Sequence, residues 1–196
     1  MHLVFDIFQG IGVAAAVGIR PFLPALAVGA LGASDVQIDF SHSSFSFLQS
    51  TPFLLGMVVG AFALALIERR LGSERLEQGV LALVIAGISI ALGALLFAGC
   101  LARGGYVIWP GLIGGVLCAG IGILATRPLL ARVRSRLDRE AIGALSLIAE
   151  AAALFAAVLS VLLPPVGVIV LGFLLWLLVA GRGRSEQKYA GLRILR

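Results

Sequence analysis

Long apolar runs separated by short polar stretches dominate the chain. A helix that crosses a bilayer needs about 20 apolar residues, with a range of roughly 17–25. By this measure the pattern predicts six spans, at residues 3–31, 52–67, 79–102, 106–126, 141–163 and 166–180. Residues 33–51 are polar with scattered phenylalanines, which is typical of an interfacial loop. The pattern therefore predicts an all-α membrane protein with six transmembrane helices.

Composition agrees with this prediction. Of 196 residues, 60% are hydrophobic and 13% are charged, whereas soluble domains are about 45–50% apolar and about 25% charged. We therefore expect a single polytopic membrane domain over residues 1–196. Cys100 and Cys118 lie in apolar runs, where cysteine behaves as a small buried hydrophobe.

The basic residues fall almost entirely on one side of a six-span arrangement. Only Arg103 lies on the other side. The positive-inside rule then predicts that both termini, including a basic tail at 182–196, are cytoplasmic. Such residues contact anionic lipids, and no nucleic-acid motif accompanies them, so we expect no nucleic-acid partner. The twelve residues on the basic side are Arg69, Arg70, Arg75, Arg132, Arg134, Arg136, Arg139, Arg182, Arg184, Lys188, Arg193 and Arg196.

The first run contains an unusual stretch, Gly18-Ile19-Arg20-Pro21-Phe22-Leu23-Pro24. An arginine in hydrocarbon costs at least about 2.5–3.5 kcal/mol, and proline breaks or kinks a helix interior. Proline also favours the first position of a helix, so Pro21 predicts a second helical segment that starts inside the membrane. The partial positive charge of that helix N-terminus and the Arg20 guanidinium together favour an anion. Arg20, Pro21 and Pro24 are therefore candidate substrate-binding residues.

A shorter stretch of similar sequence, Arg127-Pro128-Leu129-Leu130, follows the end of the fourth run. An offset of three spans would invert the second unit relative to the first, as in many small transporters. This similarity predicts a three-plus-three inverted repeat, with halves at 1–103 and 104–181 and breaks in the first and fourth helices. The alternative is that the two Arg-Pro dipeptides occur by chance. Arg127 joins the candidate site, and Pro128 is expected to open a segment on the cytoplasmic surface.

Acidic residues also occur in the apolar runs. Glu150 lies about ten residues into the fifth run, near mid-membrane at about 1.5 Å per residue. A carboxylate there must be protonated, hydrated or paired, and Arg20 is the expected partner if these runs pack together. A structural ion pair and a proton or substrate relay both remain open for Glu150. Glu68 and Asp6 are expected nearer the cytoplasmic boundary.

Small residues recur four apart at Gly10, Ala14 and Gly18, at Gly56 and Gly60, and at Gly111 and Gly115. This spacing lets helix backbones approach closely. Tight packing within the bundle and a homo-oligomer face are both consistent with it.

The stretch from Gly18 to Pro24 resembles the first-helix motif of a bacterial membrane family, domain of unknown function 4126, which runs approximately Gly-hydrophobic-Arg-x-Phe-Leu-Pro. Thr126-Arg127, Leu145-Ser146-Leu147-Ile148-Ala149-Glu150 and Gly191-Leu192-Arg193 are similar to further stretches of that family. The family often has an acidic residue where this chain has Ala151. The resemblance implies a multi-span fold with no established activity. With the charge pattern, it predicts a multi-pass protein of the bacterial cytoplasmic (inner) membrane.

No catalytic triad, nucleotide-binding glycine pattern or metal-ligand spacing is present in the sequence, so we expect no enzyme, no cofactor and no metal. The leading hypothesis is a transporter or channel for a small anion or an anionic head group, with a pathway past Arg20 and Glu150. The alternative is a non-transporting lipid-binding, assembly or structural protein in which an ion pair between these two residues holds the helices of the bundle together. A polar cavity around Arg20 would favour transport.

Overall fold

The computed structural model describes residues 2–71, 79–137 and 139–192, and every regular element in these ranges is helical. Five of the helices are long and apolar enough to cross a membrane: α3, α5, α6, α7 and α8. The prediction of an all-α, multi-span protein is confirmed at this level. The elements are α1 (His2–Ile19), α2 (Phe22–Ala33), the 3-10 turn η1 (Ser46–Gln49), α3 (Thr51–Leu71), α5 (Gly79–Arg103), α6 (Trp109–Arg134), α7 (Arg139–Leu162) and α8 (Pro164–Leu192).

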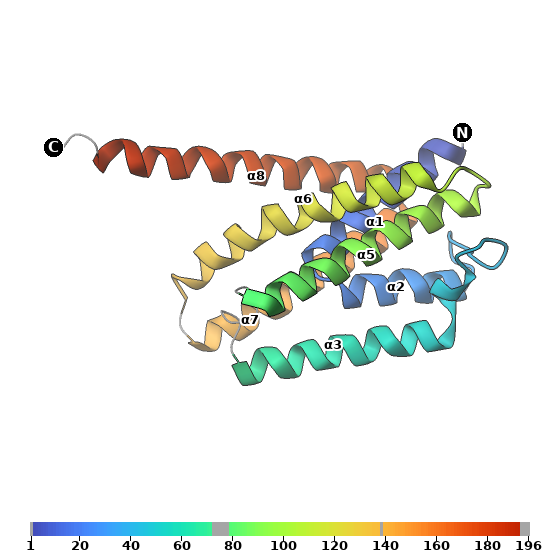
Figure 1. Cartoon of the computed structure of the whole chain (residues 1–196), viewed down its shortest axis with the longest axis horizontal. Coiled ribbons are helices and arrows are strands. Elements are labelled where there is room, and N and C mark those ends of the chain that lie inside the picture. The colour runs from blue at the N-terminus through green and yellow to red at the C-terminus, as the bar shows by residue number, and fades with distance from the viewer. Residues whose placement is uncertain (1, 72–78, 138, 193–196) are drawn as a thin grey trace.

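The first apolar run is a hairpin of two shorter helices rather than one span (Figure 1). After the break at Arg20 and Pro21, α2 returns to the end of the bundle at which α1 began. Arg103 marks that end, because its guanidinium pairs with Asp6 of α1 and donates to the main-chain oxygen of Gln37, just beyond α2. Pro21 and Pro24 account for the break, since each lacks the amide proton that a continuous helix would use.

The hairpin changes the predicted position of the N-terminus. The start of α1 lies at the Arg103 end, whereas α8 finishes at the opposite end, here called the basic end, where α3 finishes at Arg69 and Arg70 and α6 at Arg134 (Figure 1). The prediction that both termini share one side counted the first run as a complete crossing, whereas the start of α1 and the end of α8 lie at opposite ends of the bundle. Arg75, Arg193 and Arg196 lie outside the described residues.

The predicted inverted repeat does not match the described helices. Inverted halves would begin at opposite ends of the bundle, yet α1 and α6 both begin at the Arg103 end (Figure 1). In addition, α6 runs unbroken through Pro128 to Arg134, so no separate surface segment starts there. A single proline removes one amide donor from a long helix, whereas the first run loses two within one turn.

The centre of the bundle is α1, which packs against α5, α6, α7 and α8. Its residues 13–17 are all fully buried. Glycines let the neighbouring backbones approach, as predicted: a Cβ added at Gly115 would lie 2.5 Å from the Cα of Ala94. Gly56, by contrast, faces open space. The free cysteines Cys100 and Cys118 are buried, in agreement with the prediction.

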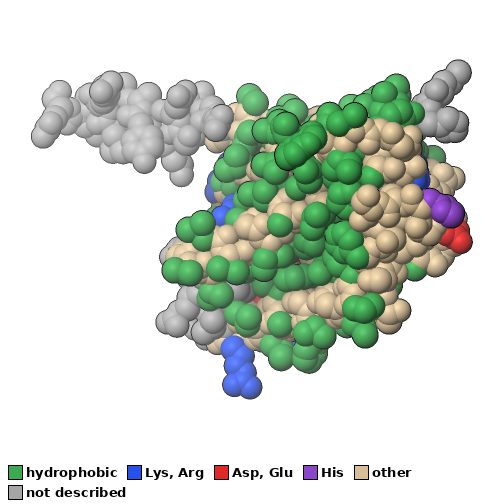
Figure 2. Space-filling model, turned by 45° about the vertical axis from the view of Figure 1, so that its right-hand side comes forward, with side chains coloured by type: hydrophobic (Ala, Val, Ile, Leu, Met, Phe, Trp, Pro, Cys, Tyr) green, Lys and Arg blue, Asp and Glu red, His purple; other side chains and the backbone are tan. Residues whose placement is uncertain are grey.

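Helix α3 lies at the edge of the bundle. It packs on α2 and η1, and the aromatic side chain of Phe22 on α2 packs against Gly60 of α3. Its outer face is apolar and exposed at Val59 and Phe62, each 65% accessible. Figure 2 shows the same character over a wider face, which is apolar along its middle with charged side chains toward its ends. This pattern is typical of a surface in contact with lipid.

Candidate functional site

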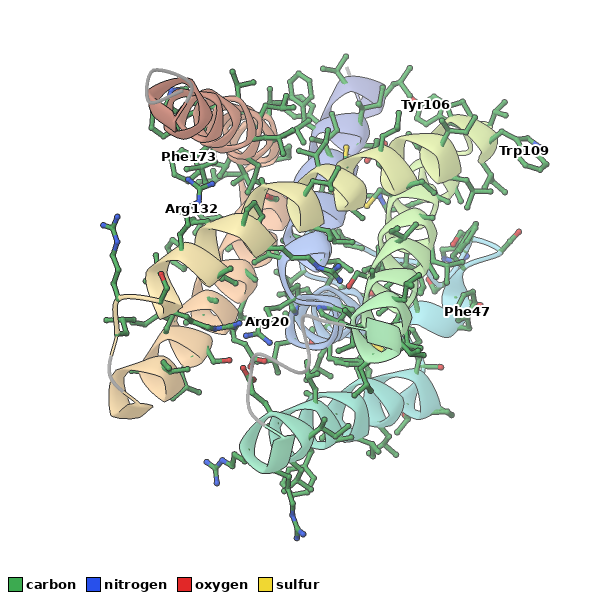
Figure 3. The ribbon with its side chains drawn as sticks, turned by 60° about the vertical axis from the view of Figure 1, so that its left-hand side comes forward. Arg20, Phe47, Tyr106, Trp109, Arg132 and Phe173 are labelled. Atoms are coloured by element: carbon green, nitrogen blue, oxygen red, sulfur yellow. The ribbon has the colours of Figure 1, made fainter. Side chains whose placement is uncertain are left out.

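The tip of the α1–α2 hairpin holds Arg20 between three other helices (Figure 3). Its Nη2 donates to the Ser146 hydroxyl of α7 at 2.6 Å and lies 3.6 Å from Glu68 Oε1 of α3. The Ser146 hydroxyl in turn donates to the same Glu68 oxygen at 2.7 Å. Glu68 directly precedes Arg69 and Arg70, so this three-residue network lies close to the basic end rather than at mid-membrane.

The carboxylate partner of Arg20 is Glu68, not the predicted Glu150. Glu150 lies one helical turn beyond Ser146 on α7 and forms no ion pair or hydrogen bond with the described residues. The predicted packing of the first run against the fifth is confirmed. The predicted depth of Arg20 is wrong, because the hairpin tip meets Glu68 of α3 and Ser146 of α7 near the basic end and not at the level of Glu150.

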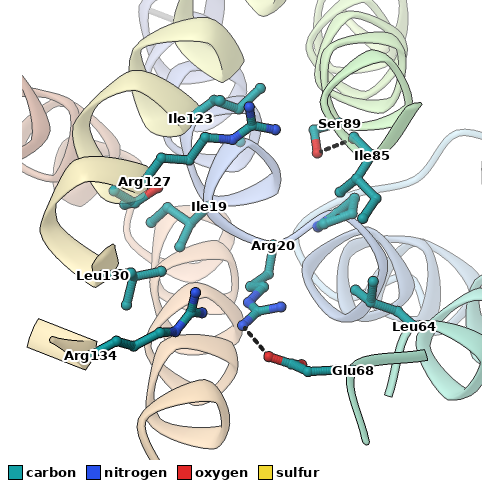
Figure 4. A pocket seen from close by; sticks show the side chains of 13 residues that line it. Ile19, Arg20, Leu64, Glu68, Ile85, Ser89, Ile123, Arg127, Leu130 and Arg134 are labelled. Atoms are coloured by element: carbon teal, nitrogen blue, oxygen red, sulfur yellow. Dashed lines mark hydrogen bonds and ion pairs between the residues drawn. The ribbon is translucent and has the colours of Figure 1, made fainter. Parts of the chain in front are cut away.

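A cavity of about 60 Å³ surrounds the hairpin tip (Figure 4). This volume exceeds what a single water molecule needs. The hairpin, α3, α5 and α6 all contribute to its wall. Its charged lining residues are Arg20, Arg127, Arg134 and Glu68.

Two of the three arginines are largely withdrawn from solvent, and Arg127 is half-buried. The Arg20 side chain is 12% exposed, and Arg134 is 7% exposed. Arg127 donates from Nη2 to the main-chain oxygen of Ala82 on α5 at 2.8 Å. Among the described lining residues, three guanidiniums accompany one carboxylate. The start of α2 at Pro21, also on this wall, adds the partial positive charge of a helix N-terminus.

Such a wall is suited to an oxyanion. Guanidinium groups are planar and always charged, and their paired N–H donors match carboxylate and phosphate oxygens. Charge-assisted hydrogen bonds of this kind are also stronger where water is partly excluded. No group of three potential metal ligands occurs among the described residues. The guanidiniums of Arg20, Arg127 and Arg134 can bind and orient an anion by such hydrogen bonds.

The structure brings together only part of the predicted site. Arg20, Pro21 and Arg127 line the cavity, whereas Pro24 is buried in the first turn of α2 and Glu150 is not on the wall. Sequence reasoning missed Arg134, although its spacing of seven residues from Arg127 puts both on one face of a helix.

Three further polar residues were missed. Glu68 and Ser89 line the cavity, and Ser146 completes the hydrogen-bonded network with Arg20. Glu68 had a usable signal, since it is the acidic residue nearest the basic end of its helix. Ser89 and Ser146 carry no such signal, because serines in apolar helices commonly donate to their own backbone.

A second hollow, of about 770 Å³, lies at the Arg103 end. Asp6 on its wall is 2% exposed and pairs with Arg103. The prediction that Asp6 lies near the basic end is therefore wrong. Arg103, which the sequence left alone on its side, has this aspartate as a partner. On the same wall, the Ser41 hydroxyl and amide donate to the Asp39 carboxylate and lower its pKa below the usual 3.8. Polar groups therefore gather at both ends of the hairpin, but arginines converge only at its tip.

Comparison with known proteins places the chain in a family. No curated protein and no solved structure gives a significant match. Residues 7–182 match the family described as a domain of unknown function, DUF4126. The matched segment contains every residue of the hairpin tip and of the cavity wall. Because the match covers most of the chain, as the motif from Gly18 to Pro24 predicted, this protein belongs to the DUF4126 family.

Proposed function

We propose that this protein binds a small oxyanion, or an anionic head group, at the hairpin tip and carries it across the membrane. The observation behind the proposal is the convergence of Arg20, Arg127 and Arg134 on one cavity, whose described lining includes the carboxylate of Glu68. Removing several guanidiniums from water is costly unless anions compensate them. An incoming anion would accept charge-assisted hydrogen bonds from these guanidiniums.

The site is proposed to face the cytoplasm. The basic end carries Arg69, Arg70 and the arginines that finish α6, and the positive-inside rule assigns such an end to the cytoplasm. The same arginines would contact anionic lipids of that leaflet. In this orientation the start of α1 lies on the other side of the membrane.

A carrier fits the packing better than an open channel. Between the two hollows, residues 13–17 of α1 are fully buried, and Gly122 of α6 lies so close to this helix that an added Cβ would be 2.5 Å from the main-chain oxygen of Ala15. An anion would cross only if the bundle changed conformation. The same closed packing favours a second candidate, a non-transporting protein that binds an anionic lipid at one face.

Equilibrium binding of inorganic phosphate to the purified protein tests the proposal. We expect Arg127→Gln to weaken binding at least about tenfold, because a hydrogen bond to a charged group contributes about 1.5–3 kcal/mol. Arg132→Gln is the matched control, since Arg132 lies on the same helix, is exposed and donates to its own helix at Pro128. The control should bind within about threefold of wild type.

Phosphate uptake into proteoliposomes then separates the two candidates. A carrier should give uptake above that of protein-free vesicles, and Arg127→Gln should abolish the excess. Binding without uptake would support the non-transporting candidate. Absence of phosphate binding, or equal binding by wild type and Arg127→Gln, would contradict the anion site itself.

A further inference from the structure

We infer that the hairpin-tip site binds a proton, on Glu68, together with each oxyanion that it receives. The inference rests on the proposed anion site and names a second ligand of that site. It follows from three features: an anion must share Arg20 with Glu68, both negative charges would lie in one small cavity, and Ser146 can bond to either form of the carboxyl group.

The guanidinium that an anion would use already has a carboxylate partner. Arg20 Nη2 lies 3.6 Å from Glu68 Oε1 and donates to the Ser146 hydroxyl, which donates to the same Glu68 oxygen. An anion that binds this guanidinium therefore weakens the ion pair of Glu68. The Glu68 side chain is only 14% exposed, so its charge becomes costly when that pair is weakened. A proton on the carboxylate removes both the charge and the cost.

Glu68 also lines the cavity that would receive the anion. It shares the wall of this cavity, of about 60 Å³, with Arg20, Arg127 and Arg134, so a bound anion would lie beside the carboxylate (Figure 4). Two negative charges in one partly buried site disfavour each other's ionised form. Because a fully ionised oxyanion keeps its charge, Glu68 is the group that takes up the proton. The step adds one solvent proton to a carboxylate oxygen and reduces the net negative charge in the cavity by one.

Ser146 keeps its contact with Glu68 in both protonation states. A hydroxyl group can donate one hydrogen bond and accept others. At present Ser146 accepts from Arg20 and donates to Glu68. A protonated Glu68 would carry its own O–H and could donate to the Ser146 oxygen, and the Ser146 hydrogen could then turn toward the anion. The link between α3 and α7 therefore survives the change of charge.

The described surroundings of Glu68 contain one other carboxyl group that could take up the proton. Glu150 lies on α7, one helical turn beyond Ser146, and is not on the cavity wall. The elements packed on α3, which are α2 and η1, carry no ionisable side chain, and neither does the described part of α5 that lines the cavity. Glu150 is therefore the group against which Glu68 is tested. The charged residues near Glu68 in the described ranges are Arg20, Arg69, Arg70, Arg127, Arg134 and Glu150.

Calorimetric titration with sulfate tests this inference. The purified protein, in uncharged detergent, is titrated at about pH 5.5 and about pH 7.5 in buffers of different ionisation enthalpy, which counts the protons taken up. Sulfate stays fully ionised in this range, so these protons go to the protein. The two histidines, His2 and His42, belong to the Arg103 end and do not line the cavity. Glu68→Gln removes the proposed proton acceptor, and Glu150→Gln is the matched control.

We expect wild type to bind sulfate at least about tenfold more tightly at the lower pH, with uptake of about one proton per sulfate, because protonated Glu68 becomes more abundant as the pH falls. Glu150→Gln should behave in the same way. Glu68→Gln should bind sulfate equally at both pH values, within about threefold, and take up no proton. Proton uptake that persists in Glu68→Gln, or that disappears in Glu150→Gln, would overturn the inference. If Glu68→Gln is too unstable to purify, the proton counts of wild type and Glu150→Gln still decide it.

Three further outcomes separate this inference from the proposed function. Sulfate binding that is equal at both pH values and takes up no proton would overturn the inference and leave the anion site intact. Binding of inorganic phosphate without binding of sulfate would also overturn it, because the site would then require a proton on the anion rather than on Glu68. Failure of both anions to bind would overturn the inference and the proposed function together.

Discussion

At the scale of single residues, Ser146 links the charges at the hairpin tip. Its hydroxyl accepts a hydrogen bond from Arg20 and donates one to Glu68, so α7 joins the hairpin and α3 through one oxygen atom. The Arg20 and Glu68 side chains are only 12% and 14% exposed, so each is costly to leave alone. The pair therefore stabilises the contact between the hairpin and α3, and under the proposed function an anion would compete with the Glu68 carboxylate for Arg20.

The Arg20–Glu68 pair should be energetically coupled. In a double-mutant cycle of Arg20→Gln and Glu68→Gln, we expect a coupling of about 1–3 kcal/mol in the free energy of unfolding, because each single change leaves the other charge partly buried. The same cycle with Glu150→Gln should give a smaller coupling, since the ion pair of Arg20 is with Glu68. Reversible unfolding in detergent provides the measurement. A larger coupling with Glu150 would show that the ion pair is misassigned.

At the scale of elements, hydropathy locates the turns between helices well and chain direction poorly. The turn between α7 and α8 falls at Pro164, and that between α5 and α6 follows Arg103, as predicted. After Pro21, however, a hydropathy pattern does not distinguish a helix that continues from one that returns. Length was the usable signal: α2 has 12 residues, or about 18 Å at about 1.5 Å per residue, which is too short for a core of about 30 Å.

The wrong direction predicted for the first run also led to a wrong partner for Arg20. Once Arg20 was assigned to mid-membrane, Glu150 became its only partner at a matching depth, and Glu68 was set aside as an interfacial residue. The cavity wall itself was recoverable only in part, because a sequence does not show which faces of α3, α5 and α6 turn toward the hairpin. Arg127 was found through its proline neighbour, although Pro128 does not break α6.

The hairpin predicts a specific topology. A protease-cleavable tag fused to the N-terminus should be cut from the same side of the membrane that labels a cysteine at Ser44, because α1 begins at the end to which α2 returns. A cysteine at Ser135, exposed beyond the end of α6, should react from the opposite side. Cleavage of the tag from the Ser135 side would restore a full first span and contradict the hairpin.

Close packing of α5 on α6 predicts opposite effects for two glycines of one helix. Gly115→Ala would place a methyl 2.5 Å from the Ala94 Cα, and we expect it to lower the free energy of unfolding by about 1–3 kcal/mol. Gly120 faces open space, so Gly120→Ala should be neutral or stabilising by up to about 1 kcal/mol. Equal effects at both sites would contradict the close contact between α5 and α6.

At the scale of the whole molecule, a tightly packed centre separates two polar ends of different character. The Arg103 end pairs its buried aspartate with an arginine, whereas the basic end concentrates guanidiniums around the hairpin tip. Helix α3, on the edge, supplies the carboxylate that partly neutralises them. Among the described residues, this difference between the two ends is what supports the proposed anion site at the hairpin tip.

The most direct test of this account is an experimental structure determined with selenate, a tetrahedral oxyanion whose selenium scatters anomalously. We predict an anomalous peak in the cavity, with selenate oxygens within hydrogen-bond distance of at least two of Arg20, Arg127 and Arg134, and loss of that peak in Arg127→Gln. The central claim is that the hairpin tip is an anion site. It would be contradicted if, at a selenate concentration that saturates binding, the anomalous peak were absent or lay outside the cavity.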